Sequence, residues 1–176
     1  MRTFATGLAL ALLAAPGLLP AQSYAIGIND QPMGGTNTTS SPNVLAFRHV
    51  FQGPMVIVAC EFLCGSTKGT GSVYIFDHDP VLDRPGALLA RGTFNAPATR
   101  CWAGAVLDKP VIVPQPNETR WLGWIMSAGG PTPTIGRTST APTYYWTSNT
   151  ALTPPISWNG PYQGYEWMYR LYGPGG

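Results

Sequence analysis

The segment Met55–Phe76 reads Met-Val-Ile-Val-Ala-Cys-Glu-Phe-Leu-Cys-Gly-Ser-Thr-Lys-Gly-Thr-Gly-Ser-Val-Tyr-Ile-Phe. Two apolar runs, Met55–Leu63 and Ser72–Phe76, flank the polar, glycine-rich stretch 65–71. Short runs of β-branched and aromatic residues bounded by Gly and Ser are typical of β-strands. The segment therefore predicts two antiparallel strands joined by a flexible hairpin loop.

The first of these strands also indicates which way its side chains point. Successive side chains of a strand face opposite sides, so Val56, Val58, Cys60 and Phe62 are expected on one face. The other face carries Glu61, so it is expected to be the more solvent-exposed one. We therefore expect Cys60 to lie in the protein core.

The rest of the chain repeats the pattern of short apolar runs separated by Gly, Pro, Asn and Ser, which is typical of a sandwich or barrel. Residues 29–43 are polar and rich in Gly and Pro, so they are expected to form a loop. We predict an all-β, antiparallel β-sandwich. Beyond the two strands above, its strands are expected at Leu45–Phe51, Leu88–Phe94, Trp102–Leu107, Pro110–Val113, Arg120–Met126, Thr143–Thr147 and Glu166–Tyr172.

Composition supports a folded β-domain. The 176 residues are 44% hydrophobic and 11% aromatic, which is too apolar for disorder. Only 10% are charged, against a usual fraction of about 25%, and helix formers are few. The formal net charge is +2 and no basic run exists, which argues against nucleic acid as a partner.

The start of the chain predicts export. A positive charge at Arg2 precedes an uncharged apolar run, Phe4 to Leu19, and small residues follow it. This is the order of a secretory signal peptide, and we expect residues 1–23 to be removed. A membrane anchor would need about 20 apolar residues, but Pro16 and Gly17 interrupt this run and Pro20 follows it. We therefore predict no membrane span, and one sandwich domain over residues 24–176.

The central region has a recognisable order of strand and turn motifs. A strand ending near Cys64 and a Gly-rich turn lead to Val73-Tyr74-Ile75-Phe76-Asp77. Three further motifs follow: Arg84-Pro85-Gly86-Ala87-Leu88-Leu89-Ala90-Arg91-Gly92-Thr93-Phe94, Lys109-Pro110-Val111-Ile112-Val113, and Glu118-Thr119-Arg120-Trp121-Leu122-Gly123-Trp124. This order resembles the jelly-roll-like β-sandwich domains of bacterial secreted and surface proteins, among them carbohydrate-binding modules. The resemblance covers roughly residues 45–126. It implies a jelly-roll-like fold and a binding role, and it supplies no catalytic residues.

The residues themselves offer little support for catalysis. The two histidines are His49, expected to be a surface or satisfied residue, and His78, which lies between two aspartates in a turn. No Gly-x-Ser-x-Gly nucleophile motif is present. The catalytic alternatives are a Ser-His-Asp triad and a pair of carboxylates, but we expect a protein that is not an enzyme.

Three carboxylates, Asp77, Asp79 and Asp83, are crowded into one turn. They could bind Ca²⁺ weakly, because Ca²⁺ prefers carboxylate oxygens. The alternative, which we favour, is that Asp77 and Asp79 bond nearby backbone N–H groups and fix the turn. We predict no cofactor, and at most weak Ca²⁺ binding at these three residues.

The cysteines are Cys60, Cys64 and Cys101, and an exported chain favours a disulfide. In one continuous strand, Cys60 and Cys64 would lie about 13 Å apart, too far to bridge without a sharp turn. We therefore predict a disulfide between Cys64 and Cys101 and a buried thiol at Cys60.

Aromatic residues offer the clearest functional signal. Most of the six tryptophans are expected to fill the core. The segment Trp158-Asn159-Gly160-Pro161-Tyr162 instead reads as a loop, where core packing explains aromatic rings less easily. We predict that Trp158 and Tyr162 form an exposed platform with Asn159 as its polar neighbour, because flat rings can stack on sugars.

Two functional hypotheses follow. The first is a secreted, non-catalytic module that binds carbohydrate. The second is a structural or adhesion module that contacts proteins at the cell surface through sheet edges or an apolar patch. An enzyme is the third and weakest possibility.

Overall fold

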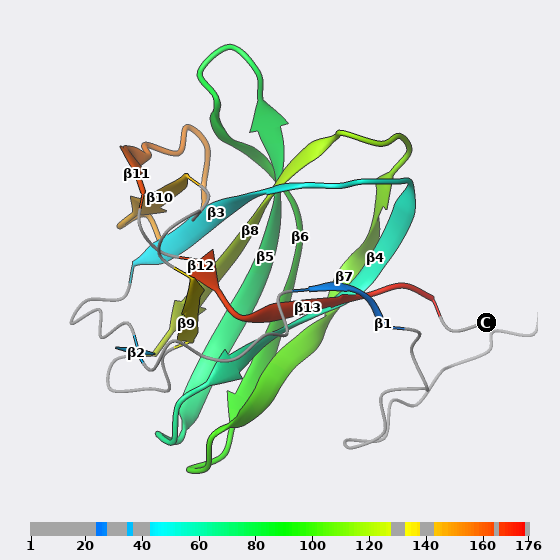
Figure 1. Cartoon of the computed structure of the whole chain (residues 1–176). Coiled ribbons are helices and arrows are strands. Elements are labelled where there is room, and N and C mark those ends of the chain that lie inside the picture. Colours follow the sequence, from blue (N-terminus) through cyan, green and yellow to red (C-terminus); the bar gives the residue numbers. More distant parts are fainter. Residues whose placement is uncertain are drawn as a thin grey trace, which may run out of the picture.

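The computed structural model describes residues 24–27, 35–36, 43–127, 133–137, 143–163 and 166–174. The predicted signal peptide, residues 1–23, lies outside them. Every regular element in the described part of the chain is a strand (Figure 1). A search of the same residues finds no helix with the length and apolar character needed to cross a membrane.

The strands form two main antiparallel sheets, which confirms the all-β sandwich. The first has four strands in the order β1 (Tyr24–Gly27), β13 (Tyr169–Tyr172), β4 (Met55–Cys64) and β7 (Cys101–Val113). The second has six, in the order β11 (Asn159–Tyr162), β10 (Tyr144–Thr147), β3 (Val44–Val50), β8 (Thr119–Met126), β5 (Gly69–Asp79) and β6 (Arg84–Ala96). A small third sheet has the order β12 (Glu166–Trp167), β9 (Thr134–Arg137) and β2 (Gly35–Thr36).

Eight of these strands pair in a nested order. β1 pairs with β13, β3 with β8, β4 with β7, and β5 with β6, and all four pairs are antiparallel. The outermost strands along the chain thus pair with each other, and the innermost pair is the β5–β6 hairpin. The pairs β13–β4 and β8–β5 then join these four ribbons into the two sheets.

Each predicted strand overlaps an observed one. Trp102–Leu107 and Pro110–Val113 are parts of the single strand β7, and Glu166–Tyr172 is divided between β12 and β13. Pro110 lies in the part of β7 between Val106 and Val111 that makes no register pairs with β4, so its missing N–H breaks no ladder bond. The strands that were not expected, β1, β2, β9 and β11, have two to four residues each.

The main core lies between the two large sheets. Phe47 and Trp124 from the six-stranded sheet pack there with Phe62 and Leu171 from the four-stranded sheet, all fully buried. Cys60 is also fully buried, as expected.

The face pattern expected for β4 is wrong in its first half. The register against β7 shifts between Ile57 and Ala59, and this irregularity changes which side chains point inward. Ile57 therefore lies in the core, while Val56 and Val58 are only half-buried. Beyond the shift, Cys60 and Phe62 face inward as predicted.

One edge of the sandwich is closed by the approach of β6 to β7. A Cβ atom at Gly92 would lie 2.5 Å from the carbonyl oxygen of Val106 and 2.6 Å from the Cβ of Ala105. Glycine therefore permits this contact, and the Arg91 N–H donates to Asp108 Oδ1 at 3.0 Å beside it.

A second apolar cluster covers part of the outer face of the six-stranded sheet. Its members on the strands include Ala46, Tyr74, Phe76 and Trp121. Residues 148–158, which we call the covering segment, contribute Leu152, Ile156 and Trp158 to the cluster.

Candidate functional site

Only part of the predicted aromatic platform is exposed. Trp158 is only 9% exposed, and its ring packs edge-on against Phe76 with ring centroids 5.2 Å apart. The prediction that Trp158 is exposed is therefore wrong, because the covering segment carries this ring down onto the outer face of the sheet. Asn159 is exposed, and Tyr162 is 43% exposed on the edge strand β11.

Tyr162 does have an aromatic neighbour. Its ring stacks on Tyr144 of the adjacent strand, with centroids 5.5 Å apart and planes inclined by 30°. The Asn159 side chain donates to the Trp146 carbonyl oxygen at 3.4 Å. A ligand-binding role for Asn159 and Tyr162 stays a prediction.

At the acidic turn between β5 and β6, Asp77 and Asp79 accept hydrogen bonds from nearby backbone N–H groups, as predicted. Asp79 Oδ1 accepts from the N–H groups of Val81 and Leu82 at 3.1 and 3.2 Å, and Asp77 Oδ1 accepts from the His78 N–H at 2.9 Å. These bonds fix the turn from within.

Each of the three carboxylates also faces an arginine. The nitrogen–oxygen distances are 3.5 Å for Arg120 and Asp77, 3.7 Å for Arg84 and Asp79, and 3.3 Å for Arg48 and Asp83. Within the described residues, no group of three His, Cys, Asp or Glu side chains could hold a metal ion. Weak Ca²⁺ binding at this turn stays a prediction.

Both histidines contact aromatic side chains. The Trp121 indole N–H donates to His78 Nδ1 at 3.2 Å, and His78 Nε2 lies 3.8 Å from Asp83 Oδ1. His49 Nδ1 lies 2.6 Å from the Tyr169 hydroxyl. Burial lowers the pKa of His49 to about 4, which keeps this ring neutral at pH 7.

The cysteines lie along one side of β4 and at the start of β7. All three are free thiols in the structure, so the predicted disulfide is not present in it. Cys64 is nevertheless the register partner of Cys101. Burial, with the nearby Cys101, raises the pKa of the Cys64 thiol to about 12.

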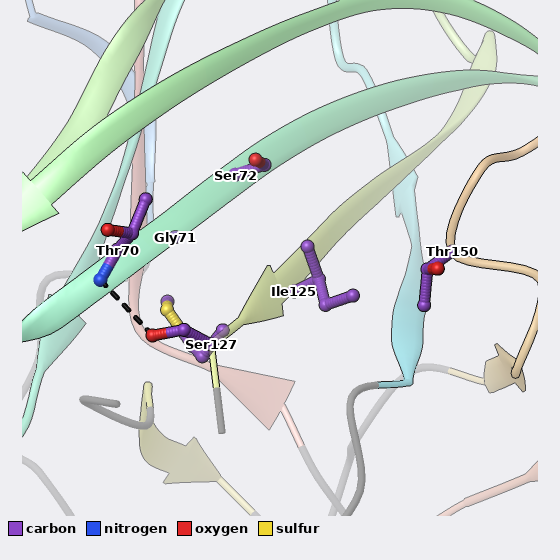
Figure 2. A pocket seen from close by; sticks show the side chains of 7 residues that line it. Thr70, Gly71, Ser72, Ile125, Ser127 and Thr150 are labelled. Atoms are coloured by element: carbon purple, nitrogen blue, oxygen red, sulfur yellow. Dashed lines mark hydrogen bonds between the residues drawn. The ribbon is translucent and has the colours of Figure 1, made fainter. Parts of the chain in front are cut away.

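A shallow hollow opens on the outer face of the six-stranded sheet (Figure 2). Its volume is about 240 Å³, and strands β5 and β8 and the covering segment supply its lining. Figure 2 shows the side chain of Ile125 between the hydroxyl residues of β5 and Thr150. The lining residues are Thr70, Gly71, Ser72, Ile125, Met126, Ser127 and Thr150.

Hydrogen bonds along the strands hold several of these hydroxyl groups in place. The Ser127 hydroxyl accepts from the Thr70 N–H at 3.2 Å, and the Thr70 hydroxyl donates to Asn95 Oδ1 at 3.2 Å. The hydroxyls of Ser72 and Thr93, which are register partners on β5 and β6, lie 3.2 Å apart. The hollow therefore continues into a polar strip that reaches β6.

The described residues that line the hollow offer hydrogen-bonding groups, and none of them has an ionisable side chain. Its polar groups are four hydroxyls and backbone atoms, and its apolar surface comes from Ile125 and Met126. Serine and threonine hydroxyls both donate and accept, so such a surface suits an uncharged partner that does the same.

Interpreting residues 65–71 as a turn leaves Thr70 and Gly71 out of the strand that begins at Ser72, so the shared face of these residues is not recognised. The available signal was the alternation Thr70-Gly71-Ser72 in one strand and Thr93-Phe94-Asn95 in the next. Such alternation places the polar side chains of both strands on one face.

Comparisons with protein-family models, with curated proteins and with solved structures find no match for this chain.

Proposed function

We propose that this protein is a secreted, non-catalytic module that binds carbohydrate in the hollow on the outer face of its six-stranded sheet. The supporting observation is the uncharged, hydroxyl-lined surface around Ile125. A sugar presents hydroxyls at its rim and C–H groups on its ring faces. The hollow offers a matching combination of Ser and Thr hydroxyls with one aliphatic side chain.

Preorganisation supports the same proposal. Thr70, Ser72 and Ser127 already make hydrogen bonds to neighbouring groups on the rigid sheet. These side chains are already ordered before a ligand binds. Binding therefore costs less conformational entropy. Small open hollows of this kind support modest affinity.

The strand order supports the finer fold assignment. We propose that the sandwich is a jelly roll, because the four nested pairs are the pairing that results when one long antiparallel ribbon is rolled up. A jelly roll agrees with the resemblance to carbohydrate-binding modules.

The first test is a glycan array on the full chain, followed by calorimetry with the glycans that bind. Thr150→Val removes one hydroxyl from the lining at nearly constant volume. It should weaken binding about 2- to 10-fold, the effect of one lost hydrogen bond, and leave the thermal midpoint unchanged. Thr153→Val is the matched control, because Thr153 is exposed on the same segment but does not line the hollow. Absence of any binding glycan, or an equal loss in both variants, would contradict the proposal.

The second candidate function is contact with other proteins. It is favoured by the outer side of β7, where Val106 is 50% and Ile112 is 65% exposed. If no glycan on the array binds, protein binding becomes the better-supported function.

A further inference from the structure

The polar strip beside the hollow is ordered in two rows that cross strands β8, β5 and β6. Neighbouring members of a row are register partners or share a hydrogen bond. The two rows, each given from β8 to β6, are Ser127, Thr70 and Asn95, and Ile125, Ser72 and Thr93. The residues from β8 and β5 line the hollow, whereas those from β6 lie beyond it.

The two β6 residues, Thr93 and Asn95, are both exposed and keep hydrogen-bonding capacity. Asn95 Oδ1 accepts from the Thr70 hydroxyl, and within the described part of the chain no group accepts from the Asn95 amide N–H atoms. The Thr93 hydroxyl shares one bond with Ser72, while a hydroxyl has one donor and two acceptor sites. Strand β6 therefore offers donors and acceptors to a ligand outside the hollow.

The strip and the hollow together have a direction. Thr150 of the covering segment lies on one side of Ile125, and the hydroxyl residues of β5 lie on the other (Figure 2). From β5 the rows continue to β6, which is the last strand of this sheet. Two inter-strand spacings separate β8 from β6, about 10 Å, which is longer than one sugar ring.

We infer that the ligand is a linear, uncharged glycan chain that crosses the strands. One sugar residue lies on Ile125 in the hollow, and the next lies on Thr93 and Asn95. This inference rests on the proposed carbohydrate binding in the hollow and adds to it the form of the ligand and a second place of contact.

The charges around the rows favour an uncharged chain. None of the six row residues is charged, so a polymer of acidic sugars would find no cationic partner among them. Arg91, two positions before Thr93 on β6, is already paired with Asp108, with 3.8 Å between Nε and Oδ2. Hydroxyl and amide groups instead match the hydroxyls of a neutral sugar, which both donate and accept.

Calorimetric titration of the full chain tests the inference, with NMR titration for the weakest ligands. The probes are linear, uncharged oligosaccharides of glucose, xylose and mannose, one to six residues long, and those of any other sugar that the array identifies. Affinity should rise about tenfold or more between one residue and three, because each additional hydrogen bond is worth about 2- to 10-fold. Beyond the width of the strip, further residues should add little.

Two variants on β6 separate direct contact from an indirect effect. Thr93→Val and Asn95→Ala should each weaken binding of the three-residue probe about 2- to 10-fold and leave binding of the single sugar unchanged. Thr150→Val should weaken binding at every chain length, because Thr150 lines the hollow. Thr153→Val, exposed and outside both the hollow and the strip, is the control and should change neither.

The outcomes that overturn the inference differ from those that overturn the proposed function. Binding that depends on Thr150 but not on chain length would overturn the inference alone. So would a preference for acidic oligosaccharides, or an equal loss at all lengths in Thr93→Val, which would mean that Thr93 acts only by orienting Ser72. Absence of binding by every probe and by the array would overturn both.

Discussion

Cys64 lies directly opposite Cys101 in the register between β4 and β7. The two residues are far apart in the sequence, and the strand pairing brings them together at the end of the four-stranded sheet. Cys60 lies further along β4 and is fully buried. Of the three thiols, Cys101 is the one that is partly exposed, so an oxidant can reach it first.

We predict that an oxidising buffer joins Cys64 to Cys101 and leaves Cys60 as a thiol. Peptide mapping without reduction checks the connectivity. A bridge closing a loop of this length adds on the order of 4 kcal/mol to the free energy of unfolding, so reductant should lower the thermal midpoint. Cys60→Ser serves as the control for connectivity and should keep the bridge. A mapped Cys60–Cys64 peptide would show that the prediction is wrong.

Trp158→Ala should lower the free energy of unfolding by about 3–5 kcal/mol, because it removes a large buried ring and leaves a cavity against Phe76. Tyr162→Ala should cost only about 1 kcal/mol, since Tyr162 is 43% exposed and its main described contact is the stack on Tyr144. Denaturant unfolding of both variants provides the comparison. Equal losses would mean that Trp158 does not belong to the core.

Stability should depend on pH through His49. Its pKa is about 4 in the folded protein and 6.5 in the unfolded chain, so below pH 6.5 the unfolded chain binds a proton that the folded state excludes. The free energy of unfolding should therefore fall as the pH drops from 6.5 towards 4, by roughly 3 kcal/mol in all. Above pH 6.5 this contribution is fully present and constant.

His49→Gln isolates this effect, because it removes the titrating ring and keeps a side chain that can accept from Tyr169. The difference in unfolding free energy between parent and variant should shrink as the pH falls from 7.5 to 4.5. A difference that stays constant over this range would exclude His49 as the source.

Gly92→Ala should destabilise the protein by about 1–3 kcal/mol, because the added methyl group would force β6 away from Val106 and Ala105 of β7. Gly53→Ala is the matched control, since a Cβ there would have no atom within 4 Å and should change stability by less than about 0.5 kcal/mol. Thermal unfolding of both variants checks the pair. If the two shifts are alike, β6 and β7 do not need this close approach.

The aromatic platform predicted from the sequence illustrates the limits of the sequence for the candidate site. The predicted loop is wrong for Asn159–Tyr162, which form the edge strand β11, although Asn159 and Tyr162 are exposed as expected and Trp158 is not. Whether a loop ring is exposed depends on what lies beneath it. Here the covering segment lies on Phe76, which is distant in sequence.

The sequence by itself determined the strands and the class of fold. Alternating apolar residues and Gly- or Pro-rich breaks are local signals, and they predicted every long strand from β3 to β8. They also predicted the fixed turn at Asp79, because a side chain there bonds backbone groups only two and three residues away.

Only the tertiary structure decided which residues of β4 face inward beyond simple alternation, and where the hollow around Ile125 forms. Each of these depends on register and on contacts between segments far apart in the chain. A single irregularity near Val58 changes which side chains face the core, and no local residue pattern marks it. The hydroxyls of Ser72 and Thr150 likewise line one hollow only because the covering segment returns to the outer face of the sheet.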